Sequence, residues 1–271
     1  MTDKINILAY FESLCGDAGT ANFLINSTLM SLFVRMLRTV RHDRLRVRLC
    51  SVIGRLVRHA TYIADELAAT GVLEVVAEAL KDPAERVRRR AMGALGELLF
   101  FCATQQHDRG AGAGGSGADG DGDTANGVGG EGEGEGRGAG GAGAGAGPWE
   151  VPGTVLSQVV RTLRPGEDEV TQHYALKAIE NIATQGGDWG TRVATPETAF
   201  LVAQIMSSTK QDALRGTAAS TLCRLCRVQP ALLAQVFDKW GVRLFVQGLT
   251  DTSSKSQGAS ATMLRCVMAR G

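Results

Sequence analysis

The apolar residues of this chain recur at the spacing of one face of an α-helix. Within residues 83–101 they follow the first at offsets of four, seven, eight and eleven, which gives one apolar stripe: Val87, Ala91, Ala94, Leu95 and Leu98. Asp82 suits the N-cap of this segment, and Pro83 suits its first helical position. The alanines of the stripe leave space for a second helix to approach closely. The pattern therefore predicts a long helix packed against others.

The same stripe returns four more times along the chain. Three copies are complete and the last is weaker: Leu45, Leu49, Val52, Ile53 and Leu56; Thr171, Ala175, Ala178, Ile179 and Ile182; Leu214, Ala218, Thr221, Leu222 and Leu225; and Ser260, Met263, Leu264 and Val267. Equivalent positions lie about 42 residues apart, or about twice that between Leu95 and Ile179. Such a period is typical of armadillo and HEAT repeats, whose helical units stack into a solenoid.

The segments between the long helices distinguish these two repeat classes. Residues 61–69 and 72–80 predict a short and a medium helix before the long helix at 84–103. Three helices per unit favour the armadillo plan over the two-helix HEAT plan. Further helices are expected at 4–15, 22–38, 44–59, 154–163, from 169, 197–207, 211–227, 231–239, 242–249 and from 254. We therefore predict an all-α, armadillo-type α-solenoid.

Residues 110–147 differ in composition from the rest of the chain. Of these 38 residues 19 are glycine and 8 are alanine, and six acidic residues accompany a single arginine. Such a stretch buries too little apolar surface to offset its ordering entropy, so we expect a disordered loop. The predicted organisation is armadillo or HEAT repeats in 1–109, the Gly/Ala-rich acidic loop in 110–147, and repeats of the same solenoid in 148–271.

Composition limits the classes of protein that this chain represents. The net charge of +1 argues against a dedicated nucleic-acid binder. The six cysteines are scattered through helical stripes, as expected of small buried residues in a reducing compartment. Because no apolar run reaches the roughly eighteen residues of a membrane span, we expect no membrane partner and a cytoplasmic location.

Motifs for catalysis are weak or missing. Alternating glycines after Gly136 match G-x-G-x-x-G only within low-complexity sequence, and the P-loop and protein-kinase landmarks are missing. Cys223 and Cys226 form C-x-x-C in the middle of a predicted helix without a second pair, which favours packing over redox chemistry or zinc binding. The four histidines show no ligand spacing. We therefore predict no catalytic residue, cofactor site or metal site.

Basic residues are concentrated on the long helices. They are either solvated and paired with nearby acids, or they face the concave groove that long helices line in armadillo stacks. The buried stripe determines which positions of the long helices would face this groove. Glu97 is the single acidic residue among those positions. The predicted protein-binding groove residues are Arg48, Arg55, Arg90, Lys177, Asn181 and Arg224. A groove of this charge favours an acidic, extended partner.

Asn181 stands where armadillo grooves that bind extended peptides often carry an asparagine. Lys177, however, occupies the place of the stacking tryptophan, and the other repeats lack the asparagine. A nuclear-import receptor is therefore disfavoured.

Several longer stretches resemble one kinase-related family. They include RHATYIADELAATGVLEVVAEALKD (58–82), ERVRRRAMGALGELLFFCATQQ (85–106) and VTQHYALKAIENIATQGGDW (170–189). These segments resemble the armadillo/HEAT region of the fourth Unc-51-like kinase of animals and protists and its plant counterpart RUNKEL. The resemblance implies the repeat arm of a pseudokinase linked to microtubules, in cilia or in plant cytokinesis, and to Fused-type kinases.

Two functions from different classes follow as hypotheses. The first is a non-catalytic protein-interaction scaffold at the cytoskeleton or cilium, with tubulin's acidic tails or a Fused-type kinase as candidate partners. The alternative is the regulatory segment of a serine/threonine-protein kinase whose ATP-binding domain is missing from this sequence. A further possibility is that the acidic loop at 110–147 covers the basic groove as an internal competitor. The oligomeric state stays open.

Overall fold

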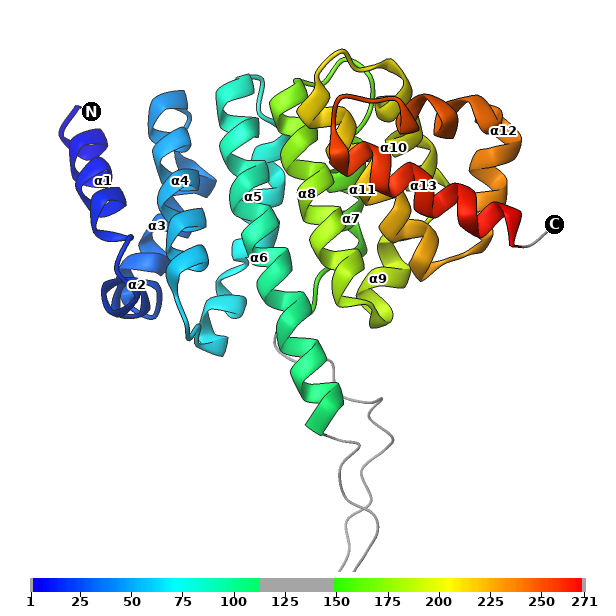
Figure 1. Ribbon diagram of the computed structural model, residues 1–271. Helices are drawn as coiled ribbons and strands as arrows, with labels where there is room; N and C mark the ends of the chain where they lie inside the picture. The colour runs from blue at the N-terminus through cyan, green and yellow to red at the C-terminus, as the bar shows by residue number, and fades with distance from the viewer. Residues whose placement is uncertain (1, 113–148, 270–271) are drawn as a thin grey trace, which may run out of the picture.

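The computed structural model describes residues 2–112 and 149–269, which form helices stacked into a curved solenoid (Figure 1). No strand occurs within these two ranges, and the predicted all-α solenoid is confirmed. The helices are α1 (Thr2–Leu14), α2 (Ala18–Ile25), α3 (Thr28–Thr39), α4 (Asp43–His59), α5 (Val72–Glu78), α6 (Glu85–Gly112), α7 (Gly153–Arg161), α8 (Glu169–Gln185), α9 (Gly187–Val193), α10 (Pro196–Ser208), α11 (Asp212–Val228), α12 (Ala231–Leu249) and α13 (Ser254–Met268). Short 3₁₀ helices occupy Asp65–Thr70 and Ala79–Lys81.

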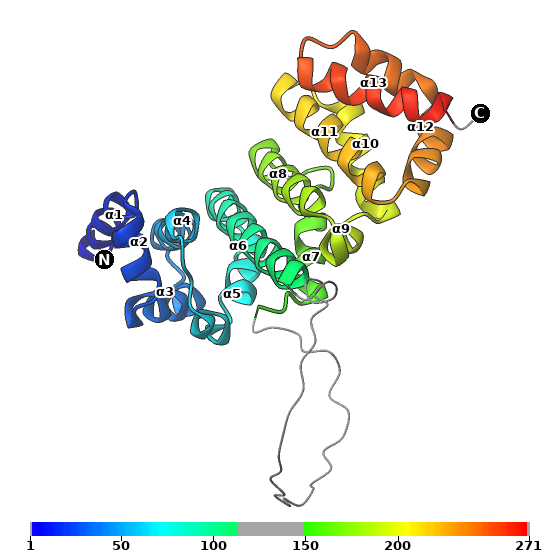
Figure 2. The same cartoon turned by 60° about the horizontal axis from the view of Figure 1, so that its bottom comes forward.

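The long helices form the inner row of the stack. Helices α4, α6, α8 and α11 follow its inner curve, while α3, α5, α7 and α10 lie in the outer row (Figure 2). All five stripe positions in each of these four long helices are buried. In α13, Ser260 and Met263 are buried, whereas Leu264 and Val267 are partly exposed. Because α6 packs directly against α8, the core is continuous between the two described ranges.

Small residues set the spacing between neighbouring long helices. A Cβ atom added to Gly54 of α4 would lie 2.9 Å from the Cα atom of Ala94 in α6. At Gly96 of α6, an added Cβ would lie 3.4 Å from the Cβ atom of Ala178 in α8. At Gly54 even a methyl group would push the helices apart, whereas at Gly96 a methyl would make ordinary contact and only a larger side chain would not fit, because protein interiors are close-packed.

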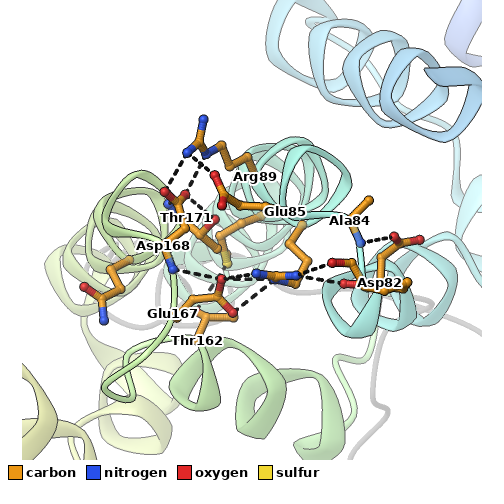
Figure 3. Close-up of polar contacts among 12 residues, drawn as sticks. Asp82, Ala84, Glu85, Arg89, Thr162, Glu167, Asp168 and Thr171 are labelled. Carbon is orange, nitrogen blue, oxygen red and sulfur yellow. Dashed lines mark hydrogen bonds and ion pairs between the residues drawn. The ribbon is translucent and has the colours of Figure 1, made fainter. Parts of the chain in front are cut away.

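Partly buried ion pairs join successive units, and we call them the inter-unit clasps. Each runs from the first turn of one long helix to the turn before the next: Arg46 to Asp82, Arg88 to Glu167, Arg89 to Asp168, and Arg215 to Asp251. In the clasps between α6 and α8, Arg88 Nη2 donates to Glu167 Oε1 at 2.8 Å and Arg89 Nε donates to Asp168 Oδ2 at 2.6 Å. Figure 3 shows the acidic turn at 167–168 facing the start of α6.

The clasp residues also fix the ends of the long helices. Asp168 is the N-cap of α8 and accepts a hydrogen bond from the Thr171 amide at 2.9 Å. The hydrogen bond from Arg89 holds the pKa of Asp168 well below its usual value, outweighing the effect of burial. Arg88 Nη1 donates to the Asp82 carbonyl at 3.0 Å, so one guanidinium contacts the turns before two consecutive long helices. Asp82 is not the predicted N-cap, because α6 begins at Glu85; its side chain accepts a hydrogen bond from the Ala84 amide in the turn before the helix.

Several predicted helix boundaries are wrong. The single helix expected at 22–38 is two helices, because Ser27 accepts a hydrogen bond from the Leu29 amide and caps α3. The helix expected at 61–69 is a 3₁₀ helix at Asp65–Thr70, whose preceding loop is held by Asn22 and Asn26 of α2. Asparagine side chains replace the backbone hydrogen bonds that a helix at 61–64 would have made.

Glycines with positive φ account for one further difference and for one boundary that was predicted correctly, the break at Gly241. Gly186 (φ 72°) and Gly187 (φ 59°) end α8 and allow the short helix α9, which the sequence pattern did not predict. Gly241 (φ 70°) interrupts α12, so that the two helices expected at 231–239 and 242–249 adjoin at a kink. Glycine adopts these left-handed conformations without the steric penalty of a Cβ atom.

The described part of the chain includes both flanks of the predicted loop. Helix α6 continues to Gly112, into the first residues of the stretch expected to be disordered, and the remaining 113–147 lie outside the described residues. After them Trp149 is buried edge-on against Phe101 of α6, with ring centroids 5.2 Å apart. Arg192 donates a hydrogen bond to the Val151 carbonyl at 2.7 Å and holds the start of the second described range.

A pair of glycine substitutions tests the helix spacing. We expect Gly54→Ala to lower the free energy of unfolding by about 1–3 kcal/mol, because the added methyl meets the backbone of Ala94. Gly93→Ala is the matched control on α6: no atom lies within 4 Å of its added Cβ, and alanine favours the helix by up to about 1 kcal/mol. Denaturant unfolding measures both changes. A Gly54→Ala variant as stable as the parent would contradict the spacing argument.

The clasps predict how stability depends on pH. The hydrogen bond from Arg215 keeps the pKa of Asp251 well below its usual value, despite burial. A carboxylate with a lowered folded pKa stabilises the protein above its unfolded pKa of about 4, and the contribution is lost as pH falls below that value. Asp251→Asn should therefore lower the unfolding free energy by roughly 2 kcal/mol at pH 7 and by less at pH 3. An equal loss at both pH values, measured by denaturant unfolding, would contradict a charged clasp.

Candidate functional site

The inner surface of the stack is the candidate site, and it is made of exposed positions on the long helices. Of the six predicted groove residues, four are exposed and two are half-buried: Arg55 on α4, Arg90 on α6, and Lys177 and Asn181 on α8 are exposed, whereas Arg48 on α4 and Arg224 on α11 are half-buried. These residues lie on the helices of the inner row (Figure 2).

Two adjoining hollows mark the N-terminal half of this surface. The large hollow has a volume of about 710 Å³ and is lined by α1, α4 and the start of α6, including Glu12, Arg44 and Arg86. The small hollow has a volume of about 150 Å³ and lies between α4, α6 and Tyr174 of α8. Ser51 and Arg90 line both, so the two hollows form one continuous basic groove.

Arginine outnumbers acidic residues along this groove. Seven arginines and four acidic residues line the two hollows: Arg44, Arg48, Arg55, Arg58, Arg86, Arg89 and Arg90, with Glu12, Asp43, Glu85 and Glu97. Four of the arginines make no hydrogen bond or ion pair with any described residue: Arg44, Arg55, Arg86 and Arg90. Their charge is therefore available to a partner.

Arg48 differs from the predicted open groove cation. It forms an ion pair with Glu12 of α1, and Ser51 donates a hydrogen bond to the same carboxylate at 2.6 Å. Burial raises the pKa of Glu12, but the hydrogen bonds from Ser51 and Arg48 outweigh it and leave this pKa below its usual value. Glu12 therefore stays ionised and neutralises Arg48.

Glu97 is the second acid of the groove. Its carboxylate lies 3.9 Å from Arg58 Nε, too far for a hydrogen bond, and both side chains are partly exposed. Burial raises the pKa of Glu97 more than the charges of Arg58 and His59 lower it. Glu97 thus contributes one acidic group against the surrounding arginines and is bound tightly by none of them.

The C-terminal half of the inner surface is more nearly neutral. Glu180 of α8 accepts a hydrogen bond from Ser220 of α11 and forms an ion pair with Lys255 of α13 at 2.9 Å. Lys177 and Lys255 lie close enough to His173 that their charges, added to the larger effect of burial, lower its pKa. Positive charge is thus concentrated on α4 and α6.

Some of the sequence reasoning about the groove is wrong. Thr217 on α11 occupies a position that the same helical geometry assigns to the groove, but it is buried and donates to the Ala213 carbonyl at 2.9 Å. The groove also holds more than the single predicted acid, since Glu12, Asp43 and Glu85 line it together with Glu97. Arg46 lines neither hollow of the groove and is held in a clasp with Asp82.

The missed arginines belong to a pattern that the sequence carries. Arg44 and Arg86 precede Arg48 and Arg90 by four residues, so each pair occupies one helical face. Extending the predicted groove stripe by one turn toward the N-terminus would have found them. Glu12 gives no such signal, because its position depends on how α1 packs on α4.

No cluster for catalysis or metal binding emerges in the described ranges. Cys223 and Cys226 are buried in the middle of α11, and burial raises the pKa of Cys223. Residues 2–112 and 149–269 hold no group of three or more His, Cys, Asp or Glu side chains arranged for a metal ion. Among the described helices, none has both the length and the apolar character to cross a membrane.

Comparison with known proteins relates this chain to two kinase-related relatives. No protein-family model matches it. The sequence is 34% identical over 269 residues to the serine/threonine-protein kinase RUNKEL of Arabidopsis thaliana, and 24% identical over 274 residues to the serine/threonine-protein kinase ULK4 of Mus musculus. Each match covers 99% of this chain and 18% of the relative, so the chain spans less than a fifth of their length.

Solved structures with the same fold are designed armadillo repeat proteins. One has a TM-score of 0.66 at 12% identity and covers 97% of this chain and 92% of its own. Another, described as a complex with the peptide (KR)4, has a TM-score of 0.64 at 12% identity and covers 96% and 90%. A third, described as designed for modular peptide recognition, has a TM-score of 0.65 at 13% identity and covers 96% and 91%. These likenesses show the fold.

The fold and the groove define this chain as an armadillo-type repeat protein. The matches to RUNKEL and ULK4 over nearly its whole length make it an armadillo-type region of that kinase-related family. The predicted family is thereby confirmed.

Thiol reactivity tests the burial of the cysteines. Burial raises the pKa of Cys15 to about 11 and that of Cys50 and Cys102 to about 12, whereas Cys266 is exposed. We expect fast modification of Cys266 by a thiol reagent at pH 8, and much slower modification of Cys15, Cys50 and Cys102, because the thiolate is the reactive form. Mass spectrometry of a time course, with Cys266→Ser as control, measures this. Rapid labelling of Cys50 in the folded protein would contradict the packing.

Proposed function

We propose that this chain is a non-catalytic protein-interaction scaffold whose basic groove binds an extended, acidic segment of a partner protein. The observation that carries the proposal is the row of arginines on α4 and α6 that form no hydrogen bond or ion pair with a described acid: Arg44, Arg55, Arg86 and Arg90. Positive charge concentrated in a concave surface attracts an acidic ligand and raises its association rate.

The solved armadillo structures support a peptide as the form of the ligand. One of the designed proteins is described in complex with (KR)4, a basic peptide, and another as built for peptide recognition. A basic peptide suits an acidic groove, whereas the groove of this chain is basic. We therefore assign it an acidic peptide, which the inner surface would accommodate lengthwise across successive units.

Tubulin's acidic tails are our candidate partner, and the cytoskeleton or cilium within the cytoplasm is our candidate location. This choice rests on the family resemblance together with the charge of the groove. A Fused-type kinase is a second candidate from the same resemblance. Residues 177, 181 and 224 extend the proposed groove beyond its most basic part, toward α11.

The names of the relatives favour one alternative. Both RUNKEL and ULK4 are named serine/threonine-protein kinases, which suits a regulatory segment that contacts a kinase domain. A thermal-shift titration with ATP separates direct nucleotide binding from this role, and we expect no shift from the chain alone. Co-purification with a separately expressed kinase domain of a relative would support the regulatory alternative.

Charge reversal tests the groove. We expect the double variant Arg55→Glu, Arg90→Glu to weaken binding of a fluorescein-labelled tubulin tail peptide by roughly tenfold or more, because both charges lie in the groove. The matched control is Arg35→Glu, Arg161→Glu: these exposed arginines lie on α3 and α7 of the outer row, and neither makes an ion pair with a described residue (Figure 2). Arg46 is unsuitable as a control because its clasp stabilises the fold.

Fluorescence anisotropy at two salt concentrations completes the test. Affinity should fall as salt rises, since the screening length shortens from about 10 Å at 0.1 M to about 3 Å at 1 M. Equal weakening by the groove and control variants would overturn the groove assignment. Absence of co-sedimentation with intact microtubules at either salt concentration would remove tubulin as the partner.

A further inference from the structure

The small hollow has features that the rest of the basic groove lacks. Three successive long helices line it: α4 supplies Arg55 and Arg58, α6 supplies Arg90 and Glu97, and α8 supplies Tyr174. Its volume of about 150 Å³ suits the end of one side chain rather than a length of peptide. The small hollow therefore has the size of a pocket for one side chain within the groove.

Three guanidinium groups in this pocket are available to a ligand. Arg55 and Arg90 have no hydrogen bond or ion pair to any described residue. Arg58 lies 3.9 Å from Glu97, beyond hydrogen-bond distance, and its side chain is largely exposed. Arg89 also lines the pocket, but its guanidinium is held by Asp168 and Glu85 (Figure 3). Three available cations face one carboxylate, so the pocket has an uncompensated positive charge of about two.

The floor of the pocket is open because it contains glycine. No atom lies within 4 Å of a Cβ atom added to Gly93, which lies between Arg90 and Glu97 on α6. A ligand group can thus approach the helix surface and contact arginines from α4 and α6 together. Tyr174, half-exposed on α8, forms the third side.

Arginine in this arrangement favours a doubly charged tetrahedral anion. A guanidinium presents parallel N–H donors that match phosphoryl or carboxylate oxygens in a bidentate manner. A phosphorylated side chain carries about −1.5 to −2 charges at pH 7 and three acceptor oxygens, whereas a glutamate carries one charge and two oxygens. The three arginines therefore offer more to a phosphoryl group than to a carboxylate.

We propose that the small hollow binds one phosphorylated serine or threonine side chain of the acidic partner segment. This rests on the proposed function, since it assigns one position of the peptide in the basic groove. Phosphorylation of the partner would then strengthen its binding, and the groove would select a phosphorylated form over an unmodified one.

The experiment compares three labelled peptides that differ at one position. Each is a twelve-residue chain of alternating Glu and Gly with serine, phosphoserine or glutamate at its centre, measured by fluorescence anisotropy at fixed salt. We expect phosphoserine to bind about fivefold or more tighter than glutamate, and glutamate to bind more tightly than serine, in line with charge and acceptor number. Competition with inorganic phosphate shows whether the phosphate group alone binds as tightly as the phosphopeptide.

Two variants separate phosphoryl recognition from general charge. Arg55→Lys, Arg90→Lys keeps the positive charge but removes the bidentate donors, and Gly93→Met fills the open floor without changing charge. Both should bring the ratio of phosphoserine to glutamate affinity close to one, and an unchanged ratio would overturn phosphoryl recognition by these residues. Arg35→Lys, Arg161→Lys, on α3 and α7 of the outer row, is the matched control and should preserve the preference. Thermal unfolding checks that each variant is folded.

The outcomes distinguish this proposal from the one it rests on. Equal affinity for the phosphoserine and glutamate peptides would overturn the phosphoryl pocket and leave the acidic-segment scaffold standing. Inorganic phosphate that binds as tightly as the phosphopeptide would show an anion site without partner recognition, which also overturns it. If none of the three peptides binds, both proposals fail.

Discussion

Side-by-side packing of the long helices is the constraint on which the rest of this structure depends. Each long helix buries one stripe against its neighbours, and Gly54 against Ala94 lets two of them approach at backbone contact. Burial of this apolar stripe supplies the main driving force, since a single unit cannot cover its own hydrophobic face. The opposite faces of the same helices then line one inner surface. The groove is thus a product of the packing and needs no separate loop or domain.

Arginine serves two distinct purposes on neighbouring faces of these helices. Arg88 and Arg215, one residue after the first stripe position, are paired with acids and join the units. Arg90, two residues further along α6 than Arg88, faces the groove without an acidic partner in the described structure. A small change in position around the helix therefore converts a structural cation into one available for binding. Net charge over the whole sequence hides this division.

The repeat was predictable because burial and sequence period are tied directly in an α-helix, and every complete stripe from Leu45 to Leu225 is buried. The groove cations on α4 and α6 followed from the same geometry. Glu12 could not be predicted, because its contact with Arg48 depends on the packing of a helix outside the repeat. The break at Ser27 and the short helix after Gly186 depend on local capping and positive φ, which compete with helical propensity and leave only a weak signal in periodicity.

The clasps all lie at one end of the long helices, in their first turns. At the other end, the described ion pair between α4 and α6 is the long, exposed contact of Arg58 with Glu97. Between α4 and α6, the rim at the first turns is therefore the more strongly fastened one. Bending of the whole superhelix should pivot about the rim that carries the clasps and change the width of the opposite rim. The curvature of the inner surface can then adapt to a bound segment, while the order of the units stays fixed.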